Sequence, residues 1–219
     1  FLQPRDEDGA WSEPFDPADN SDGNGYCEAN AWIYTWFVPH DVEGLIASIG
    51  GDASFLAKLD QFFADGYFDS SNEPSFHIPF LYNYAGAPHR AQEVVRETLA
   101  ADFTAEPGGL PGNDDAGATS AWYLLAAMGI YPVTPGDSTY QIVSPVFQRI
   151  TIPLDPAWYD GGTFVIEATG NSAANRYIQS ATLNGVTLDR TWITHAEIVA
   201  GGTLTLVMGP QPSTWGAGN

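Results

Sequence analysis

The hydrophobic period of the chain changes near residue 133, and this change constrains the fold more than any other feature. Before it, apolar residues recur every three or four positions, which is typical of amphipathic helices. After it, short runs rich in β-branched and aromatic residues alternate with turn residues, which is typical of strands. We therefore predict an α+β chain, with helices within residues 1–133 and a β-rich accessory region over residues 134–219.

Several segments of the first part are predicted to be helical. The clearest is residues 87–103, where Ala91, Val95 and Leu99 share one face and charged side chains the other. The last one follows a Gly-rich turn and stops at Gly129, before Pro132. Pro74 suits the first turn of a further apolar segment, residues 75–84. The predicted helices cover residues 26–37, 42–49, 53–64, 87–103 and 117–129.

The second part reads as an antiparallel sheet. The pair Asn184-Gly185 predicts a type I′ hairpin, because both residues tolerate a positive φ. The linker over residues 132–137 is short, so we expect this region to pack on the helices as an accessory sheet rather than to form a separate carbohydrate-binding sandwich. The predicted strands cover residues 140–143, 147–152, 163–168, 177–183 and 204–208.

The charge and composition restrict the partners of the chain. Its 27 acidic and 7 basic residues give a net charge of −20, which would repel nucleic acid and anionic membrane surfaces. No apolar run approaches the roughly 20 residues that a membrane-spanning helix needs. The single cysteine, Cys27, excludes an internal disulfide. An acidic, aromatic, lysine-poor chain is typical of a secreted bacterial enzyme, so we expect a secreted or periplasmic location.

The first 25 residues show neither a helical nor a strand period and are dense in Pro, Asp, Gly and Asn. We predict a long surface loop there. Because the chain begins abruptly at Phe1, we expect Phe1 to be a cut site within a longer polypeptide.

Acidic side chains stand at the entrances of three apolar helical segments. They are Glu28, the pair Asn72-Glu73, and the run Asn113-Asp114-Asp115. Helix capping and the helix dipole explain one acid at each entrance. A carboxyl group buried among aromatic rings would instead hold its proton for general acid catalysis. If the entrances converge, as in an α/α barrel, the acids could catalyse glycoside hydrolysis or bind calcium.

Four segments carry a resemblance to a known family. YCEANAWIYTWFVPHDVEGLI, SNEPSFHIPFLYNYAGAPHRAQEVVR, GLPGNDDAGATSAWYLLAAMGIYPVTPG and YIQSATLNG with TWITHAEI resemble the calcium-dependent exo-acting α-mannosidases of glycoside hydrolase family ninety-two. The resemblance runs over nearly the whole chain but covers only the C-terminal part of such an enzyme. It implies a partial (α/α)6 barrel, as a fragment of a larger enzyme. An N-terminal fragment of the same enzyme, with a β-sandwich and the first barrel helices, is the partner that it implies.

The resemblance also implies roles for individual residues. Glu28 matches the general acid, and Asn72 and Glu73 match calcium ligands. Asp115 is expected to be the base that activates water, with Asp114 supporting it. Ile33 replaces a glutamine that is usual in the family, which affects sugar specificity. The residues expected to contact the substrate are Asn30, Trp32, His40, Asp41, His77 and Asn113. For His40 and Asp41, holding a turn is the alternative to a functional pair.

The resulting expectation is an inverting, exo-acting α-mannosidase that removes terminal mannose from a mannose-containing glycan with bound calcium. Two alternatives stay open. One is a non-catalytic carbohydrate-binding module, for which the aromatic content of 13% and the β region are the support. The other is a relative that cleaves mannose-1-phosphate linkages. Such relatives do without the acid because phosphate leaves readily, so the presence of Glu28 favours an ordinary glycosidic leaving group.

Overall fold

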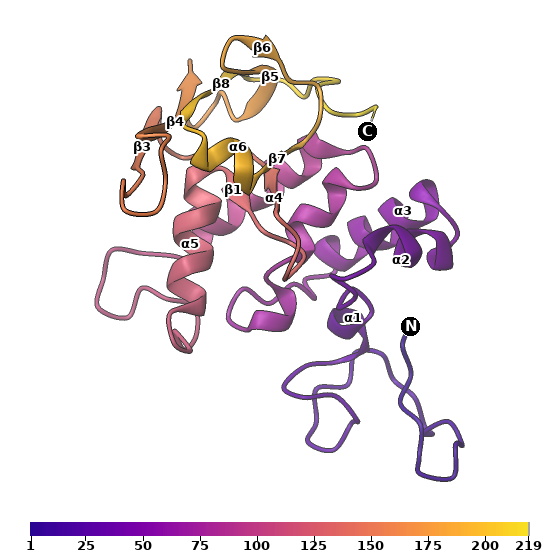
Figure 1. Ribbon diagram of the computed structural model, residues 1–219. Helices are drawn as coiled ribbons and strands as arrows, with labels where there is room; N and C mark the ends of the chain where they lie inside the picture. The colour runs from indigo at the N-terminus through magenta and orange to yellow at the C-terminus, as the bar shows by residue number, and fades with distance from the viewer. Residues whose placement is uncertain (219) are drawn as a thin grey trace.

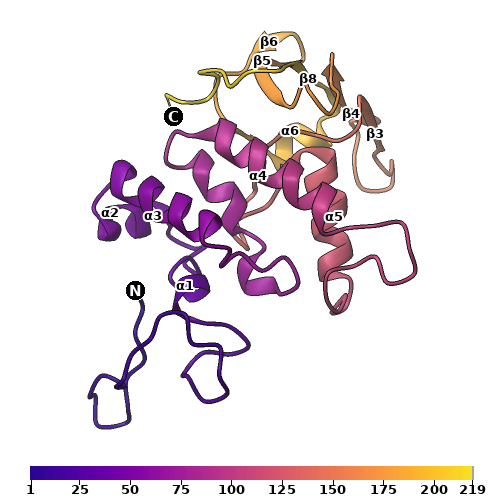
Figure 2. The ribbon, with the colours of Figure 1, turned by 180° about the vertical axis from the view of Figure 1, so that it is seen from behind.

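The structure of the protein is a computed structural model that describes residues 1–218. Helices occupy the middle of the chain and two sheets its C-terminal part, as the sequence period predicts. Figures 1 and 2 show β4, β5, β6 and β8 above α4 and α5, and the irregular N-terminal segment extending below α1. In the described part, no helix is long and apolar enough to cross a membrane.

The helical part consists of short elements and two long helices. The elements are α1 (Ala31–Tyr34), α2 (Val42–Ile49), α3 (Asp52–Ala64), the 3-10 helices η1 (Glu73–Ser75) and η2 (Ile78–Asn83), α4 (Pro88–Ala101) and α5 (Ala118–Met128). Glycines in the left-handed region flank α5 on both sides, Gly117 with φ 93° and Gly129 with φ 84°. The glycine signals in the sequence therefore located this helix correctly.

Two helix predictions were wrong. Only four residues of the segment 26–37 are helical, because Glu28 is left-handed and the Asn30 side chain caps the helix by accepting a hydrogen bond from the Ile33 amide. The segment 75–84 forms two 3-10 turns instead of an α-helix. Pro79 stands at the start of η2 and has no amide hydrogen to donate.

A core of aromatic and aliphatic side chains holds the helices together. Trp122 of α5 is buried, its ring stacks on Phe103 at 5.6 Å, and its Nε1 donates to the Phe76 carbonyl at 2.8 Å. Trp36 is fully buried, with the rings of Phe55 and Phe62 packed edge-on against it. Because these rings come from distant segments, they fix α5 against the η1 loop and α3 against the segment that follows α1.

The C-terminal part forms two sheets. A three-stranded sheet has the order β1-β2-β7, and a five-stranded sheet the order β3-β4-β8-β5-β6. The strands are β1 (Ile130–Tyr131), β2 (Thr139–Ile142), β3 (Arg149–Pro153), β4 (Thr163–Thr169), β5 (Tyr177–Leu183), β6 (Val186–Thr187), β7 (Trp192–Thr194) and β8 (Gly202–Gly209), with α6 (His195–Val199) before β8. Asn184 and Gly185 join β5 to β6 with φ of 53° and 79°, so the predicted hairpin is confirmed.

The prediction of an entirely antiparallel sheet needs one correction. Strands β4 and β8 pair in parallel, with Phe164 opposite Gly202, whereas the other pairs of the described part are antiparallel. A parallel pair needs a long crossover, and the chain between these strands supplies it through β5, β6, β7 and α6.

The sheets pack on the helices through α4. The Gln92 side chain accepts a hydrogen bond from the Ile178 amide at 2.8 Å, and Glu93 accepts one from the Tyr177 hydroxyl at 2.9 Å. Arg176 adds an ion pair to Glu93 at 2.9 Å. The division of the chain at residue 133 and the partial (α/α)6 barrel both stay predictions.

Candidate active site

The structure brings the three acid-bearing loops together. The Asn72 side chain donates a hydrogen bond through Nδ2 to the Glu28 carbonyl at 3.1 Å. On its other side this loop touches the Gly-rich turn, where a Cβ at Gly112 would lie 2.5 Å from the Ser71 carbonyl oxygen. Only a glycine allows this approach, so the turn that carries Asp114 and Asp115 is held against the loop that carries Glu73.

Both residues expected to be acid and base have a strained backbone. Within residues 1–218, four non-glycine residues have a positive φ: Glu28 (53°), Asp115 (44°), Ala116 (60°) and Asn184 (53°). Asn184 forms the hairpin turn, which requires this conformation. The other three lie in the acid-bearing loops. Strain of this kind costs on the order of 1–3 kcal/mol per residue and concentrates at functional sites.

Glu28 borders a cavity of about 700 Å³. Its side chain is exposed, so the alternative of a carboxyl group buried among aromatic rings is wrong. Asn30 and Ile33 also line this cavity, as does the Ser70 and Ser71 loop. The side chain of Ile33 is buried, so the position that departs from the family pattern presents an apolar surface beside the expected acid.

The two aspartates of the third loop have different surroundings. Asp114 accepts a hydrogen bond from the Ser120 amide at 2.8 Å, and its carbonyl accepts from the Gly117 amide at 3.0 Å, so it caps α5. The Asp115 carboxylate is exposed and takes no hydrogen bond within residues 1–218. The Asn113 side chain is exposed too. A carboxylate without a structural partner is available to a water molecule, which favours Asp115 over Asp114 as the base.

Glu73 and Asn72 offer oxygen ligands of the kind that calcium prefers. Glu73 is half-buried, and its carboxylate has no partner in the described part of the chain. Asn72 Oδ1 accepts a hydrogen bond from the Glu73 amide at 3.2 Å, and a carbonyl oxygen has a second lone pair. Residues 1–218 contain no group of three His, Cys, Asp or Glu side chains that could hold a metal. These donors therefore fit calcium in kind but supply only part of its six to eight ligands.

Three expected substrate contacts are buried: Asn30, which is 3% exposed although it borders the Glu28 cavity, Trp32 and His77. Trp32 is 7% exposed and stacks on Tyr67 at 4.6 Å. His77 is buried, and its Nε2 donates to the Trp36 carbonyl at 2.7 Å. Glu73 lines a mostly apolar cavity of about 380 Å³ with His77 and Phe37. Trp32 packs in the core, and His77 forms part of the wall behind Glu73.

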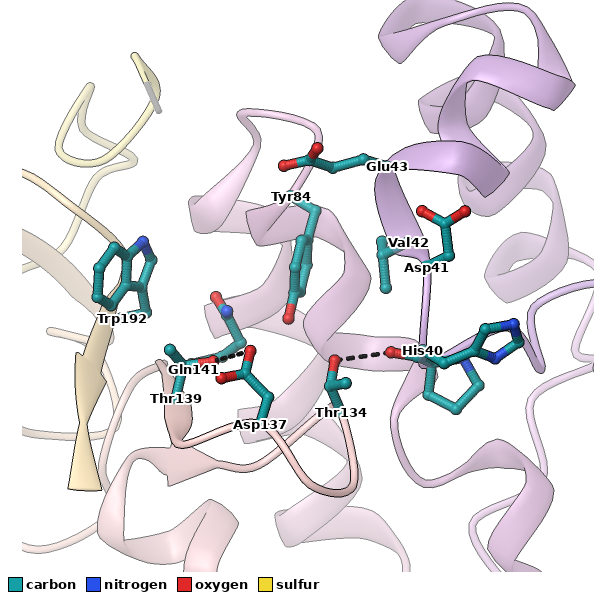
Figure 3. Close-up of a pocket in the computed structure, with 11 residues that line it drawn as sticks. His40, Asp41, Val42, Glu43, Tyr84, Thr134, Asp137, Thr139, Gln141 and Trp192 are labelled. Carbon is teal, nitrogen blue, oxygen red and sulfur yellow. Dashed lines mark hydrogen bonds between the residues drawn. The ribbon is translucent and has the colours of Figure 1, made fainter.

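His40 and Asp41 lie at a separate cavity of about 370 Å³ (Figure 3). It has no lining residue in common with the Glu28 cavity. Asp41 accepts a hydrogen bond from the Gly44 amide at 2.9 Å and thereby caps α2. The pKa of Tyr84, which also faces this cavity, is raised by burial. The structure therefore does not bring His40 and Asp41 together with Glu28.

The buried His77 predicts a loss of stability in acid. Burial lowers its pKa to about 4 from the ordinary 6.5, because the charged ring is poorly solvated. Between these values the unfolded chain takes up a proton that the folded chain excludes, so the free energy of unfolding falls as pH drops from 6.5 to 4. We expect this residue to contribute about 3 kcal/mol to that loss. The free energy of unfolding of the wild type and of His77→Gln can be measured with urea at several pH values in this range. We expect it to fall less steeply with decreasing pH in the variant. An equally steep fall in both proteins would contradict the prediction.

The comparison with protein families decides the family. Residues 1–210 match the glycosyl hydrolase family 92 catalytic domain. The chain belongs to this family. The match extends from the irregular N-terminal segment through both sheets, so the three acid-bearing loops all lie within it.

Individual relatives of this family 92 chain are similar over its full length. The chain is 36% identical over 228 residues to a protein of Arthroderma benhamiae described as an uncharacterized secreted glycosidase. A family GH92 α-mannosidase from Bacteroides thetaiotaomicron, solved in complex with mannoimidazole, superimposes with a TM-score of 0.89 at 31% identity over 98% of the chain. An inverting mannosidase from the same organism superimposes with a TM-score of 0.89 at 33% identity over 99%.

The family 92 chain spans only part of these relatives. It covers 29% of the Arthroderma benhamiae protein and 30% and 32% of the two mannosidases. That the chain comes from a bacterium stays a prediction, because its relatives include proteins of both Arthroderma benhamiae and Bacteroides thetaiotaomicron.

Two further residues of the site were not identified from the sequence. Asn24, in the N-terminal loop, donates through Nδ2 to the Ala29 carbonyl at 2.9 Å, and Asn20 lines the Glu28 cavity. This loop has no periodic pattern, so its position beside Glu28 could not be predicted from the sequence.

Proposed function

We propose that this chain provides the catalytic acid and base of an exo-acting, inverting α-mannosidase that removes terminal mannose from a glycan. The observation that carries the proposal is the meeting of the three acid-bearing loops, with Glu28 and Asp115 both in the left-handed conformation, in a family 92 catalytic domain. The names of the two Bacteroides thetaiotaomicron relatives support mannose as the sugar, and one supports inversion. The secreted relative supports a location outside the cell.

The two carboxyl groups divide the chemistry of inversion. Glu28 donates its proton to the departing glycosidic oxygen, while Asp115 takes a proton from a water that attacks the opposite face of the sugar. Inversion needs a separation of about 6.5–9.5 Å between such groups, which leaves room for the water. The Asn72-Glu73 loop contacts both the Glu28 loop and the Gly-rich turn before Asp115, which supports this pairing.

Glu73 and Asn72 would hold the calcium ion beside the sugar. A bound calcium ion would supply positive charge and coordination for sugar hydroxyls. The chain itself positions the ligands, because the η1 turn fixes Glu73 next to Asn72 and the Asn72 amide is tied to the Glu28 loop.

We further propose that the rest of the site comes from the part of the enzyme that the relatives have beyond this chain. An apolar groove of about 580 Å³ runs between α5, β3 and α6. Leu124 and Phe147 on its rim are 56% and 47% exposed. Exposed apolar side chains beside a groove support an interface there, and the remaining two thirds of the enzyme would cover it.

The test uses the full-length protein and α-linked mannobiose. We expect release of free mannose, detected by chromatography, with the β-anomer formed first in the NMR spectrum. A protein that binds mannobiose without releasing mannose would support a carbohydrate-binding module instead. Release of the α-anomer first would contradict inversion.

Chelation tests the metal separately. EDTA is expected to abolish mannose release by the full-length protein, and added calcium to restore it, because the ion's ligands come from the loop between the acid and the base. Magnesium is the control, since it demands a smaller octahedral site and should restore less. Turnover that is indifferent to EDTA would remove calcium from the mechanism.

A further inference from the structure

Three consecutive backbone carbonyls around Glu28 are each held by a side chain from another segment. The Tyr34 hydroxyl donates to the Cys27 carbonyl at 3.0 Å, Asn72 to the Glu28 carbonyl at 3.1 Å, and Asn24 to the Ala29 carbonyl at 2.9 Å. The donors belong to α1, the η1 loop and the N-terminal loop respectively. We call these three side chains the carbonyl clamp.

The clamp acts on a stretch of backbone that regular structure does not fix. Residues 27–29 belong to no helix or strand, and the φ of Glu28 is 53°. A glutamate in this conformation relaxes to a negative φ unless neighbouring bonds oppose it. Such a relaxation would rotate the Cα–Cβ bond and swing the carboxyl group away. The Tyr34 and Asn72 bonds hold the two peptide planes that flank Glu28, and the Asn24 bond holds the following plane, so together they fix the direction of the Glu28 side chain.

The donors are themselves held in place. Asn24 also donates to the Asp19 carbonyl at 2.6 Å and accepts from the Tyr26 amide at 2.9 Å, so both ends of its amide are engaged. The Tyr34 ring packs against Tyr26 at 5.4 Å and against Phe37 at 5.8 Å. Side chains fixed by further contacts can transmit that order to the backbone that they bind.

From this geometry we propose that Tyr34, Asn24 and Asn72 are positioning residues that aim the carboxyl group of Glu28 at the departing glycosidic oxygen. The inference rests on the proposed function, because the clamp acts on catalysis only if Glu28 is the proton donor. The proposal predicts that loss of a clamp bond impairs only one of the two catalytic steps. Loss of a clamp bond weakens proton donation and leaves the activation of water by Asp115 unchanged.

The test compares two leaving groups in the full-length enzyme. Mannobiose needs its leaving oxygen protonated, whereas 2,4-dinitrophenyl α-mannoside has a leaving group that departs without a proton. Tyr34→Phe removes only the hydroxyl, and Asn24→Ala removes the second donor. For each we expect kcat on mannobiose to fall about tenfold and kcat on the dinitrophenyl substrate to change less than about twofold. Asn72 is excluded from the test because it is also a proposed calcium ligand.

Tyr177→Phe is the matched control. It deletes a hydroxyl that donates at 2.9 Å to Glu93, on β5 at the sheet side of the molecule (Figure 1). Both substrates should keep their wild-type kcat in this variant. Equal losses on both substrates in Tyr34→Phe and Asn24→Ala, or no loss, would overturn the clamp. A wild-type enzyme that hydrolyses neither substrate would overturn the proposed function instead.

Discussion

Asp115→Asn is expected to lower kcat by about 10² to 10⁴ on every α-mannoside, whatever its leaving group. The amide cannot take a proton from water, and attack by water is required on both good and poor leaving groups. The side chain is exposed and takes no hydrogen bond within residues 1–218, so the change should leave the fold intact. The measurement is kcat on mannobiose and on 2,4-dinitrophenyl α-mannoside in the full-length enzyme, with thermal unfolding as a check of folding.

Asp114→Asn provides the comparison. Its side-chain oxygen caps α5 by accepting from the Ser120 amide, and an asparagine oxygen can accept the same bond. We therefore expect a much smaller loss of kcat than in Asp115→Asn. Azide should restore turnover of the dinitrophenyl substrate by Asp115→Asn, because an anionic nucleophile needs no base. The assignment of the two residues would be reversed if Asp114→Asn were the variant with the large, azide-rescued loss.

Local signals in the sequence predicted the elements whose ends are set by nearby residues. Asp41 caps α2 and Gly50 ends it, so both bounds could be found from residue type alone. The Asn184-Gly185 pair gave the hairpin for the same reason. The capping box formed by Thr194 and Glu197 was also present in the sequence, and α6 could have been predicted from it.

Elements that depend on distant partners could not be predicted. The pairing of β4 with β8 joins residues almost forty positions apart, and alternation of apolar residues carries no information about strand direction. The segment 26–37 is apolar nearly all round, which favours a helix until the left-handed Glu28 is known. Asn72, which donates to the Glu28 carbonyl, is 44 positions further along the chain, and the sequence does not place it beside Glu28.

The types of residue in the site could be predicted from the sequence, but not the cavity that each residue lines. Acids ahead of apolar segments pointed to Glu28, Glu73 and Asp115 without any structure. The close approach of Gly112 to Ser71 brings two of these loops together, and no periodic pattern encodes such a contact. His40 and Asp41 follow the Glu28 segment directly in the sequence, yet they line another cavity because the chain turns at Pro39 after α1.

Glu28→Gln is expected to show a larger difference between the losses of kcat on the two substrates than any other variant. Glutamine keeps the size of the side chain but has no proton to donate to the departing oxygen. We expect kcat on mannobiose to fall by about 10² to 10⁴, and kcat on 2,4-dinitrophenyl α-mannoside to fall by less than about tenfold. Full-length enzyme is assayed on both substrates, and the ratio of the two losses is the quantity compared.

The ratio of the two losses in Glu28→Gln is also the largest ratio that any variant of the carbonyl clamp can show. Because Tyr34 and Asn24 act only through Glu28, neither of their variants can discriminate between the substrates more than Glu28→Gln does, and combining either with Glu28→Gln should add no further selectivity. Glu43→Gln is the matched control, since Glu43 is an exposed glutamate of α2 at the His40 cavity. Equal losses on the two substrates in Glu28→Gln would mean that Glu28 does not donate the proton, and a different acid would then have to be sought outside this chain.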